Sequence, residues 1–428
     1  GASAWQFGTH YAGLWAAIAP GAGFSESAEF LRLNLNGADS PPSWEQKLFH
    51  LYNATDYAAN LFNTPVVAYN GENDGQKQAA DMMDHAMAEE DMRLKRIIGP
   101  KTGHSYHADS KVEIDRILDA IAERGRDPYP RKIRFTTWTL TYNRMKWVTV
   151  DALGQHWERA RLNAEIEGDG SVRVESTNVV AFTLEMGPGG CPLDVSRKPT
   201  VTIDGQKVIA TGPMSDRSWR AHFRKAGGAW KLTDSPVTAG LHKSHGLQGP
   251  VDDAFLDSFI FVLPTGVPIA PAASRWVASE QQRAIREWRR EFRGEAQSRN
   301  DVDITDADIA GSNLVLWGDP GSNRILARIA DKLPIKWNAE SIVVGEKRYA
   351  ATTHVPILIF PNPLNPMRYV VLNSGFTFRE FDYLNNARQT PKLPDYAVID
   401  ITVPPDDRYP GKIVLAGFFN EGWGFQSP

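Results

Sequence analysis

The sequence has only one cysteine, Cys191, and this excludes an intramolecular disulfide framework and a cysteine-rich metal site. Long apolar runs are also missing. The nearest candidate, residues 259–273, is interrupted by Pro264, Pro268 and Pro271, whereas a membrane-spanning helix needs roughly eighteen or more consecutive apolar residues. We therefore expect no membrane partner, and we expect Cys191, which follows a Gly-Pro-Gly-Gly turn, to be structural.

An excess of one charge is missing as well. The 47 Lys and Arg residues nearly balance the 51 Asp and Glu residues, which gives a formal net charge of −4, and no block of like charge concentrates either sign. A protein that binds nucleic acid usually carries a basic patch or stripe. We therefore expect no nucleic-acid partner.

The chain is too long for a single hydrophobic core. Its 428 residues exceed the roughly 250–300 at which single cores stop growing, and 42% hydrophobic with 23% charged residues is typical of globular proteins. The pattern of apolar residues and turns changes near residues 128 and 245. We predict a mixed multidomain chain of α/β and β parts: an α/β domain at 1–128, a β-sandwich at 129–245 and a C-terminal α/β domain at 246–428.

In the first domain, short β-like segments alternate with helical patterns. Residues 65–69 and 96–98 are β-like, whereas residues 76–90 and 111–124 carry apolar side chains at three- and four-residue spacing. Such alternation is typical of a mostly parallel sheet.

The second domain is rich in strand patterns separated by glycine-containing turns, which favours a β-sandwich. The segments with alternating apolar residues are Arg134–Val148, Arg159–Glu167, Ser171–Glu185, Thr200–Ala210 and Ser218–Leu232.

The third domain returns to α/β patterning. Residues 276–295 form an amphipathic helix with Ala284, Ile285, Trp288 and Phe292 on its apolar face. The other elements that we expect are strands at 313–317, 369–373 and 412–417 and a helix at 324–333.

Two loops that follow consecutive strands of the first domain carry acidic and imidazole groups. Asp74 lies in Asn-Gly-Glu-Asn-Asp-Gly, and His104 lies in Gly-His-Ser-Tyr-His on the next loop. In an open parallel sheet the carboxyl ends of the strands share one crevice, so we expect the two side chains to face each other. Their order is that of the acid and the base in the Ser, Asp, His sequence of α/β-hydrolase triads. In such a triad the acid holds the imidazole tautomer, and the imidazole takes the proton of the nucleophile.

Three motifs make residues 1–127 similar to a known family. The first extends from Gly-Ala-Ser-Ala-Trp-Gln to Trp-Ala-Ala-Ile-Ala-Pro-Gly over residues 1–21, the second is Gly-Glu-Asn-Asp at 71–74, and the third is Gly-His-Ser-Tyr-His at 103–107. With these motifs the chain resembles the C-terminal part of an α/β-hydrolase of the prolyl oligopeptidase-like serine peptidase and esterase type. The resemblance implies a partial α/β-hydrolase sheet followed by accessory domains.

The nucleophile of this family is not found in the sequence. In the family a Gly-x-Ser-x-Gly elbow starts the helix that carries the first motif, so Gly1 would be the last glycine of the elbow. No Gly-x-Ser-x-Gly occurs anywhere in the 428 residues. The resemblance therefore predicts Asp74 and His104 as acid and base of a truncated domain, with the serine, the oxyanion loop and the preceding strands ahead of Gly1.

Other interpretations of these residues stay open. Asp74 fits a turn acid, because Asn-Asp-Gly is a turn sequence. His107 competes for the role of the base, although the family pattern favours His104. The nearest hydroxyl groups, those of Ser3 and Ser105, have no elbow around them, and Ser3 fits the first turn of a helix.

Metal and cofactor sites have little support. His242 and His245 lack a third ligand at a recognisable spacing. The loop 318–323, Gly-Asp-Pro-Gly-Ser-Asn, lacks the Lys-Ser/Thr pair of a phosphate-binding loop, and a strand-to-helix turn with an N-cap explains it equally well. We expect neither a metal ion nor a cofactor.

Carboxylate pairs offer an alternative catalytic site. The sequence has 13 Trp, which would suit sugar stacking, and adjacent acids at Asp252/Asp253 and Asp406/Asp407. Adjacent carboxylates diverge on a strand, however, whereas the two acids of a glycosidase stand several ångströms apart across the substrate.

Three functions follow from these observations. The first is a serine peptidase or esterase fragment that has the acid and the base but little triad activity by itself, the second is a glycoside hydrolase using a carboxylate pair in residues 250–428, and the third is a non-catalytic binding or assembly module. The substrate would be a peptide, an ester or a saccharide. Because a half sheet exposes an apolar edge, we expect rearranged segments or a second copy of the chain to cover it. The resemblance suggests export from a bacterial cell, but the sequence itself predicts no location.

Overall fold

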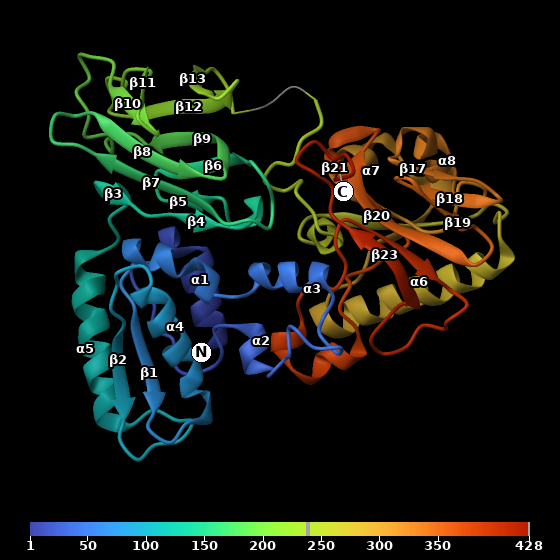
Figure 1. The fold of residues 1–428 in the computed structure, drawn as a ribbon, viewed down its shortest axis with the longest axis horizontal. Helices are drawn as coiled ribbons and strands as arrows, with labels where there is room; N and C mark the ends of the chain where they lie inside the picture. The colour runs from blue at the N-terminus through green and yellow to red at the C-terminus, as the bar shows by residue number, and fades with distance from the viewer. Residues whose placement is uncertain (237–239, 427–428) are drawn as a thin grey trace. The chain divides into compact units, whose positions relative to one another are not determined.

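The computed structural model describes residues 1–236 and 240–426. About 29% of the chain is helix and 29% is strand, and the sheets are partly parallel and partly antiparallel (Figure 1), which confirms the predicted mixed α/β multidomain class. The contacts divide the chain into two compact units: unit 1 comprises Gly1–Pro41 and Phe49–Ala239, and unit 2 comprises Pro42–Leu48 and Gly240–Pro428. The division into three domains stays a prediction.

The first part of unit 1 is a small parallel sheet with helices (Figure 1, blue). Strands β1 (Val67–Gly71) and β2 (Lys95–Gly99) pair in parallel, and the bridges Ile18–Val66 and Gly21–Tyr69 place an extended segment alongside β1. The helical elements of this part are α1 (Ala2–His10), η1 (Ala12–Leu14), α2 (Ser27–Phe30), η2 (Phe49–Leu51), η3 (Thr55–Asn63), η4 (Gly75–Lys77), α4 (Gln78–Ala88) and α5 (Ala108–Arg124).

The two longer helices of this part follow the predicted patterns. In α4 the buried positions Ala79, Met83 and Met87 recur at four-residue spacing, so the helix packs one apolar stripe into the core of this part. Helix α5 packs Ile114 against the residues of both strands and ends at Gly125, whose φ of 71° terminates the helix.

The second part of unit 1 is a β-sandwich of two sheets around one hydrophobic core. One sheet has the order β11-β10-β8-β7-β3, with β4 also paired to β7, and the other has the order β13-β12-β9-β6-β5. The strands are β3 (Lys132–Ile133), β4 (Thr136–Thr137), β5 (Arg144–Met145), β6 (Val148–Leu153), β7 (Ala160–Ile166), β8 (Val172–Thr177), β9 (Val179–Met186), β10 (Thr200–Ile203), β11 (Gln206–Ile209), β12 (Trp219–Ala226) and β13 (Ala229–Thr233).

Four of the five predicted alternating segments of the sandwich are divided: residues 171–185, 200–210 and 218–232 each form two strands, and residues 134–148 contain a turn. The alternation over residues 134–148 predicts continuous extended chain, but the structure has the turn η5 (Leu140–Tyr142) inside this range, with the Thr139 hydroxyl accepting from the backbone N–H of Thr141. A side chain that satisfies a backbone donor offers the chain an alternative to the strand ladder.

Unit 2 contains a mixed sheet of order β15-β14-β16-β21-β20-β22-β23 and a smaller sheet of order β17-β18-β19. Strands β15, β14, β16 and β21 are parallel neighbours, and β20, β22 and β23 continue the sheet in antiparallel fashion. The strands are β14 (Phe259–Leu263), β15 (Ser298–Asn300), β16 (Asn313–Leu316), β17 (Ile335–Trp337), β18 (Ser341–Val344), β19 (Lys347–Ala350), β20 (His354–Asn362), β21 (Asn365–Leu372), β22 (Tyr396–Asp400) and β23 (Lys412–Gly417).

The longest helix of unit 2 begins earlier than predicted. Helix α6 spans Pro271–Phe292, because proline is tolerated at the first helical position, and it ends where Arg293 adopts a φ of 61°. The other helical elements of the unit are α3 (Ser43–Leu48), η6 (Val251–Phe255), η7 (Asp301–Asp303), α7 (Asp306–Gly311), α8 (Arg324–Ile329), η8 (Ala330–Lys332), η9 (Glu380–Leu384) and η10 (Asn386–Arg388).

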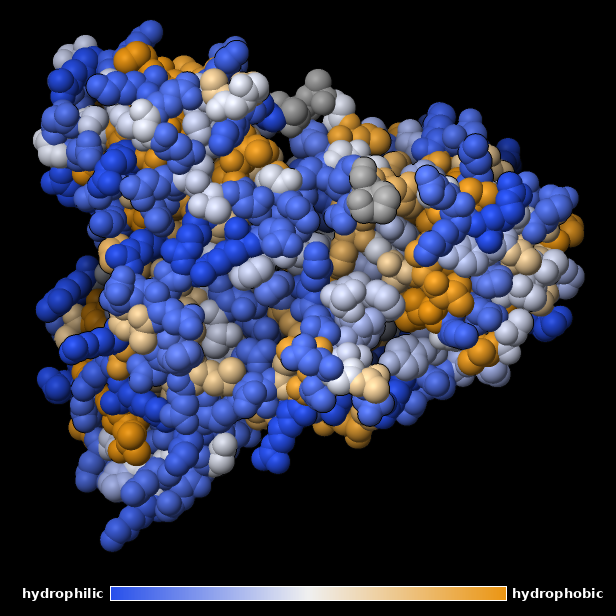
Figure 2. Space-filling view, in the orientation of Figure 1, coloured by the Kyte–Doolittle hydropathy of each residue, from blue (hydrophilic) through white to orange (hydrophobic). Residues whose placement is uncertain are grey.

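The visible surface is polar with scattered apolar residues (Figure 2). Among the most exposed apolar side chains are those of Val267 and Met367, at 82% and 76% exposure. In the described part of the chain, none of the helices combines the length and the apolar character needed to cross a membrane.

Candidate functional site

The loops that follow β1 and β2 bring the predicted acid and base together. Asp74 follows β1, and His104 lies on the loop after β2. The Nδ1–H group of His104 donates to Oδ2 of Asp74 across 2.9 Å. The side chain of Asp74 is 4% exposed and that of His104 is 64% exposed, so a buried acid holds a base that reaches solvent.

The two loops are held in register by backbone contacts. The N–H of Asn73 donates to the carbonyl of Thr102 at 2.9 Å. A Cβ atom on Gly71 would lie 2.2 Å from the carbonyl oxygens of Thr102 and Gly103, so only glycine allows this approach. The hydroxyl of Tyr69 donates to the carbonyl of Ser105 at 2.9 Å and fixes the far side of the loop.

The acid is also linked to the start of α1. Oδ1 of Asp74 accepts from the backbone N–H of Gln76 at 2.8 Å, and Oε1 of Gln76 accepts from the N–H of Gly23 at 3.1 Å. A Cβ atom on Gly23 would lie 2.3 Å from the nitrogen of Ala2. Two hydrogen bonds, both made by Gln76, therefore connect Asp74 to Gly23, and Gly23 lies against the first turn of α1.

This arrangement can orient a proton acceptor. Nδ1 of His104 carries a proton and donates a hydrogen bond to Asp74. The unprotonated Nε2 is therefore the basic nitrogen. Within residues 1–236 and 240–426, no hydroxyl group forms a hydrogen bond with that nitrogen. Ser3 is exposed on the first turn of α1, as predicted, and the hydroxyl of Ser105 has no hydrogen bond within the described chain.

The competing base is not paired with the acid. The backbone N–H of His107 donates to the hydroxyl of Tyr69 at 2.8 Å, and Nδ1 of His107 is buried with no hydrogen-bond partner among the described residues. The structure thus brings His104, and not His107, into contact with Asp74.

The other predicted candidates lie in structural positions. Cys191 is buried in the core of the β-sandwich. Asn323 caps α8 by accepting from the N–H groups of Ile325 and Leu326, so the loop 318–323 is the expected strand-to-helix turn. Among the described residues, no group of three or more His, Cys, Asp or Glu residues could hold a metal ion, so His242 and His245 belong to no such group.

The candidate carboxylate pair Asp252/Asp253 lies on η6 rather than on a strand, and its two carboxylates point to different partners. Asp252 accepts from the hydroxyl of Thr377 at 2.5 Å, whereas Asp253 accepts from the hydroxyl of Tyr369 at 2.6 Å. Burial raises the pKa of Asp252 to about 6 and that of Asp253 to about 7, although these hydrogen bonds oppose the shift. Asp253 is buried and Asp252 is partly buried, and the carboxylate of each acid is held by a hydroxyl group of the same unit.

The second candidate pair serves as a loop turn. Oδ1 of Asp406 accepts from the backbone N–H groups of Arg408 and Tyr409, at 2.8 and 2.7 Å. Asp407 contributes its backbone carbonyl to Phe381.

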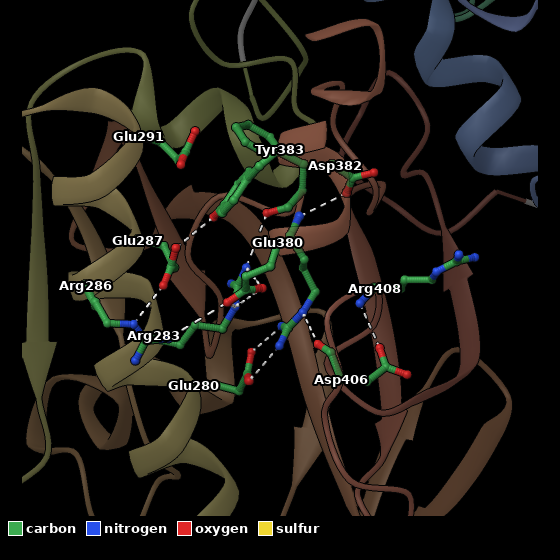
Figure 3. Close-up of polar contacts among 12 residues, drawn as sticks. Glu280, Arg283, Arg286, Glu287, Glu291, Glu380, Asp382, Tyr383, Asp406 and Arg408 are labelled. Atoms are coloured by element: carbon green, nitrogen blue, oxygen red, sulfur yellow. Dashed lines mark hydrogen bonds and ion pairs between the residues drawn. The ribbon is translucent and has the colours of Figure 1, made fainter. Parts of the chain in front are cut away.

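A buried network of charges that the sequence did not reveal joins α6 to the segment around η9 (Figure 3). Arg379 donates to both carboxylate oxygens of Glu280, at 2.6 and 3.2 Å. Arg283 donates to Glu380 at 3.0 Å, and the hydroxyl of Tyr383 donates to Glu287 at 3.1 Å. Because the charged groups are paired, this network fixes α6 to the segment around η9.

A second imidazole–carboxylate pair was also missed. Nδ1 of His50 lies 2.7 Å from Oδ2 of Asp56, and the ring of His50 stacks on Trp138 with the centroids 3.7 Å apart. The indole N–H of Trp138 donates to the carbonyl of Asp56. Because the stacked ring belongs to the β-sandwich segment, this pair joins the two parts of unit 1.

The β-sandwich holds a third polar cluster. The hydroxyl of Thr183 donates to Asp151 at 2.6 Å and lies 2.7 Å from Nδ1 of His222. Burial raises the pKa of Asp151 to about 6. Here the acid contacts the hydroxyl rather than the imidazole, and Thr183 is 6% exposed, so the cluster satisfies buried polar groups on three neighbouring strands.

Comparisons with known proteins add no assignment. No protein-family model matches the chain, and neither a curated protein nor a solved structure matches it. The function is therefore argued from the chain's own residues.

Proposed function

We propose that unit 1 carries the acid and the base of a serine-type hydrolase acting on a peptide or an ester. The observation that supports this proposal is the hydrogen bond of 2.9 Å between Nδ1 of His104 and Oδ2 of Asp74. The two residues lie on loops at the carboxyl ends of adjacent parallel strands, where α/β proteins place their ligands. A lone turn acid would not need an imidazole partner on the neighbouring loop.

In the proposed triad these two residues would perform the tasks of the acid and the base. The carboxylate of Asp74 fixes the tautomer in which Nε2 of His104 is unprotonated, and it stabilises the imidazolium once Nε2 has taken a proton. Nε2 removes the proton of the nucleophile during attack and returns it to the leaving group. Since the imidazole is 64% exposed, a substrate can reach it.

The proposed nucleophile is the serine of a Gly-x-Ser-x-Gly elbow placed immediately ahead of Gly1. The support comes from α1, whose first turn lies against Gly23, which is hydrogen-bonded through Gln76 to the loop of the acid. In the prolyl oligopeptidase-like family the elbow opens the corresponding helix. A serine there would stand next to the loops that carry Asp74 and His104.

A free strand edge favours a second role, contact with another copy of the chain. The backbone groups of Ile18 and Pro20 bond to the strand β1 segment, whereas those of Ala17 and Ala19 form no backbone hydrogen bond within the described residues. Unpaired edges of this kind bind further strands. Light scattering of the purified chain tests this role: a dimer supports it, and a monomer at all concentrations contradicts it.

The experiment that tests the hydrolase proposal uses the protein isolated from its source. Its intact mass and the reading frame ahead of Gly1 are determined, and it is treated with a serine-directed fluorophosphonate. We expect an upstream elbow whose serine is labelled, with labelling lost in the His104→Ala variant. An in-frame stop codon directly before Gly1, or hydrolysis of aryl glycosides that does not depend on His104, would overturn the proposal.

A further inference from the structure

The parallel part of the sheet in unit 2 has a point at which the chain connections change direction. From β14 the chain passes through α6 to β15, which lies on one side of β14. From β16, on the other side of β14, it continues to β21 on the far side of β16. The loops that leave β14 and β16 therefore separate, and a crevice at the carboxyl ends of such strands is where open α/β sheets bind ligands.

A pocket of about 140 Å³ lies at this point. It is bordered by the loop after β14, the turn after β16, one side of the first three turns of α6, and Trp337 of β17; the lining residues used below are Pro264, Pro268, Gln281, Gly318, Asp319 and Trp337. This volume holds several water molecules or one small ring.

The floor of the pocket is rigid. Oδ1 of Asp319 accepts from the N–H groups of Gly321 and Ser322, at 3.0 and 2.9 Å, and Oδ2 accepts from the N–H of Ile269 at 2.8 Å. Gly318 has a φ of 103°, and a Cβ atom there would lie 2.5 Å from Oγ of Ser322. One buried carboxylate thus fixes both loops, and a lone pair of Oδ2 remains for a donor from the pocket.

The wall formed by α6 contains an unsatisfied amide. Nε2 of Gln281 is buried and has no hydrogen-bond partner among the described residues, and Gln281 lines the pocket. A buried amide group without a partner is destabilising, because its hydration is lost and no hydrogen bond replaces it. Whichever way the amide is turned, its inner atom needs a partner, and a molecule in the pocket can provide one once the Gln281 side chain turns toward it.

Apart from Ser274 and Ser322, the remaining lining residues are apolar or glycine, and none of them carries a positive charge. The side chains of Pro264, Pro268 and Trp337 provide flat hydrocarbon and aromatic surface, and no lysine or arginine lines the pocket. A ligand therefore needs a hydrogen-bond acceptor for Gln281, a donor for Asp319 and an apolar face.

We propose that this pocket binds a neutral, hydroxylated six-membered ring, such as a hexopyranose or the terminal residue of a saccharide. A sugar hydroxyl donates and accepts, so adjacent hydroxyls can satisfy both Gln281 and Asp319, while the C–H face of the ring packs on Trp337. The proposal concerns unit 2 and does not depend on the hydrolase function of unit 1.

Two other ligand classes fit less well. A phosphate or carboxylate would meet the negative charge of Asp319 without any cationic side chain to offset it. An alkyl amine would pair with Asp319, but its ammonium group has no acceptor to offer the amide N–H of Gln281.

The test is a titration of the full chain with D-glucose, D-galactose, D-mannose and N-acetylglucosamine, followed by saturation-transfer NMR and tryptophan fluorescence. Sodium phosphate and butylamine are titrated in parallel. The variants are Gln281→Ala and Trp337→Ala, and the matched control is Gln282→Ala, which removes an exposed amide from the same helix outside the pocket.

We expect at least one of the sugars to bind, and Gln281→Ala to weaken it by roughly three- to tenfold, the effect of one hydrogen bond. Trp337→Ala should abolish the saturation transfer to the ring protons, and Gln282→Ala should bind as the unaltered chain does. Absence of binding for all four sugars, tighter binding of phosphate or butylamine, or equal binding by the Gln281→Ala and Gln282→Ala variants would overturn the proposal.

Discussion

Oδ2 of Asp74 and Nδ1 of His104 share a hydrogen bond of 2.9 Å, although the acid is 4% exposed and the imidazole is 64% exposed. This difference in exposure separates the task of the acid from that of the imidazole. The acid is fixed from behind by the N–H of Gln76, so it can hold the imidazole without moving. The imidazole presents its other nitrogen to solvent, where a substrate and a nucleophile would arrive.

The first prediction concerns this pair in a form of the protein that carries the proposed serine. Asp74→Asn should lower kcat of ester hydrolysis by about 10⁴-fold, because an amide no longer selects the required tautomer. His104→Ala should lower it further, on the order of 10⁶-fold, because the base itself is lost. Both values are obtained from the rate of turnover of an activated ester.

His107→Ala provides the matched control, since it removes the neighbouring imidazole, which does not contact Asp74. Its turnover should stay close to that of the unaltered protein. Equal losses in the His104 and His107 variants would contradict the assignment. In the 428-residue chain itself, a downfield NMR signal of the Nδ1 proton of His104 should disappear in Asp74→Asn.

The second prediction concerns the acid sensitivity of unit 1. His10 is buried between Tyr57 and Tyr142, with each pair of ring centroids 4.2 Å apart, and burial lowers its pKa to about 4, although the carbonyl of Gln6 opposes the shift. The unfolded chain, with a histidine pKa near 6.5, binds a proton that the folded chain does not. Stability from this residue is therefore complete above about pH 6.5 and falls by about 3 kcal/mol as the pH drops to 4.

Replacing His10 by Phe keeps an aromatic ring and removes the titration. Urea unfolding at pH 7 and pH 4.5 should show that the His10→Phe variant loses less stability on acidification than the unaltered chain does. If the two proteins lose the same amount, the imidazole is protonated in the folded state and the prediction is wrong.

The third prediction concerns unit 2, where stability should fall as the pH rises and not as it drops. Burial raises the pKa of Asp253 to about 7 from an ordinary value of 3.8, so the folded chain retains a proton that the unfolded chain releases. Stability from this group is complete below the unfolded pKa and is lost as the pH rises to about 7. Asp253→Asn cannot lose a proton, so relative to this variant the unaltered chain should lose about 3 kcal/mol between pH 5 and pH 8. Thermal unfolding at the two pH values measures the difference, and a constant difference would contradict it.

The sequence predicted the elements that have a local pattern. Helix α4 lies within the range 76–90, and α5 overlaps the range 111–124. Because parallel strands end at one edge of their sheet, the sequence also predicts that Asp74 and His104 face each other. These predictions succeed because the period of apolar residues and the order of strands are properties of short segments.

Contacts between segments that lie far apart in the sequence leave no local pattern from which they could be predicted. Asn60 donates to the carbonyls of Thr9 and Thr136 and accepts from the N–H of Thr136, so it joins the sheet part of unit 1 to the β-sandwich. Nothing in the sequence near Asn60 indicates these partners. For the same reason the partner of Asp253 was not predicted: Tyr369 is 116 positions away. The pocket beside Gln281 was also missed, because the crevice is defined by the order of strands in space.

The fourth prediction concerns the pairing of Arg379 with Glu280 in the charge network of Figure 3. The two side chains are 5% and 9% exposed, so removing one charge leaves the other buried without its partner. Arg379→Met should destabilise unit 2 by about 3–5 kcal/mol, whereas the double variant Glu280→Leu/Arg379→Met should recover most of that loss, since apolar residues of similar volume avoid the desolvation of both charges. Arg289→Met, which removes an arginine at 70% exposure from α6, the helix that carries Glu280, is the control and should change stability by less than about 1 kcal/mol. Thermal unfolding of the full chain measures all three. A double variant that is less stable than Arg379→Met would mean that Glu280 contributes to the fold through groups other than Arg379.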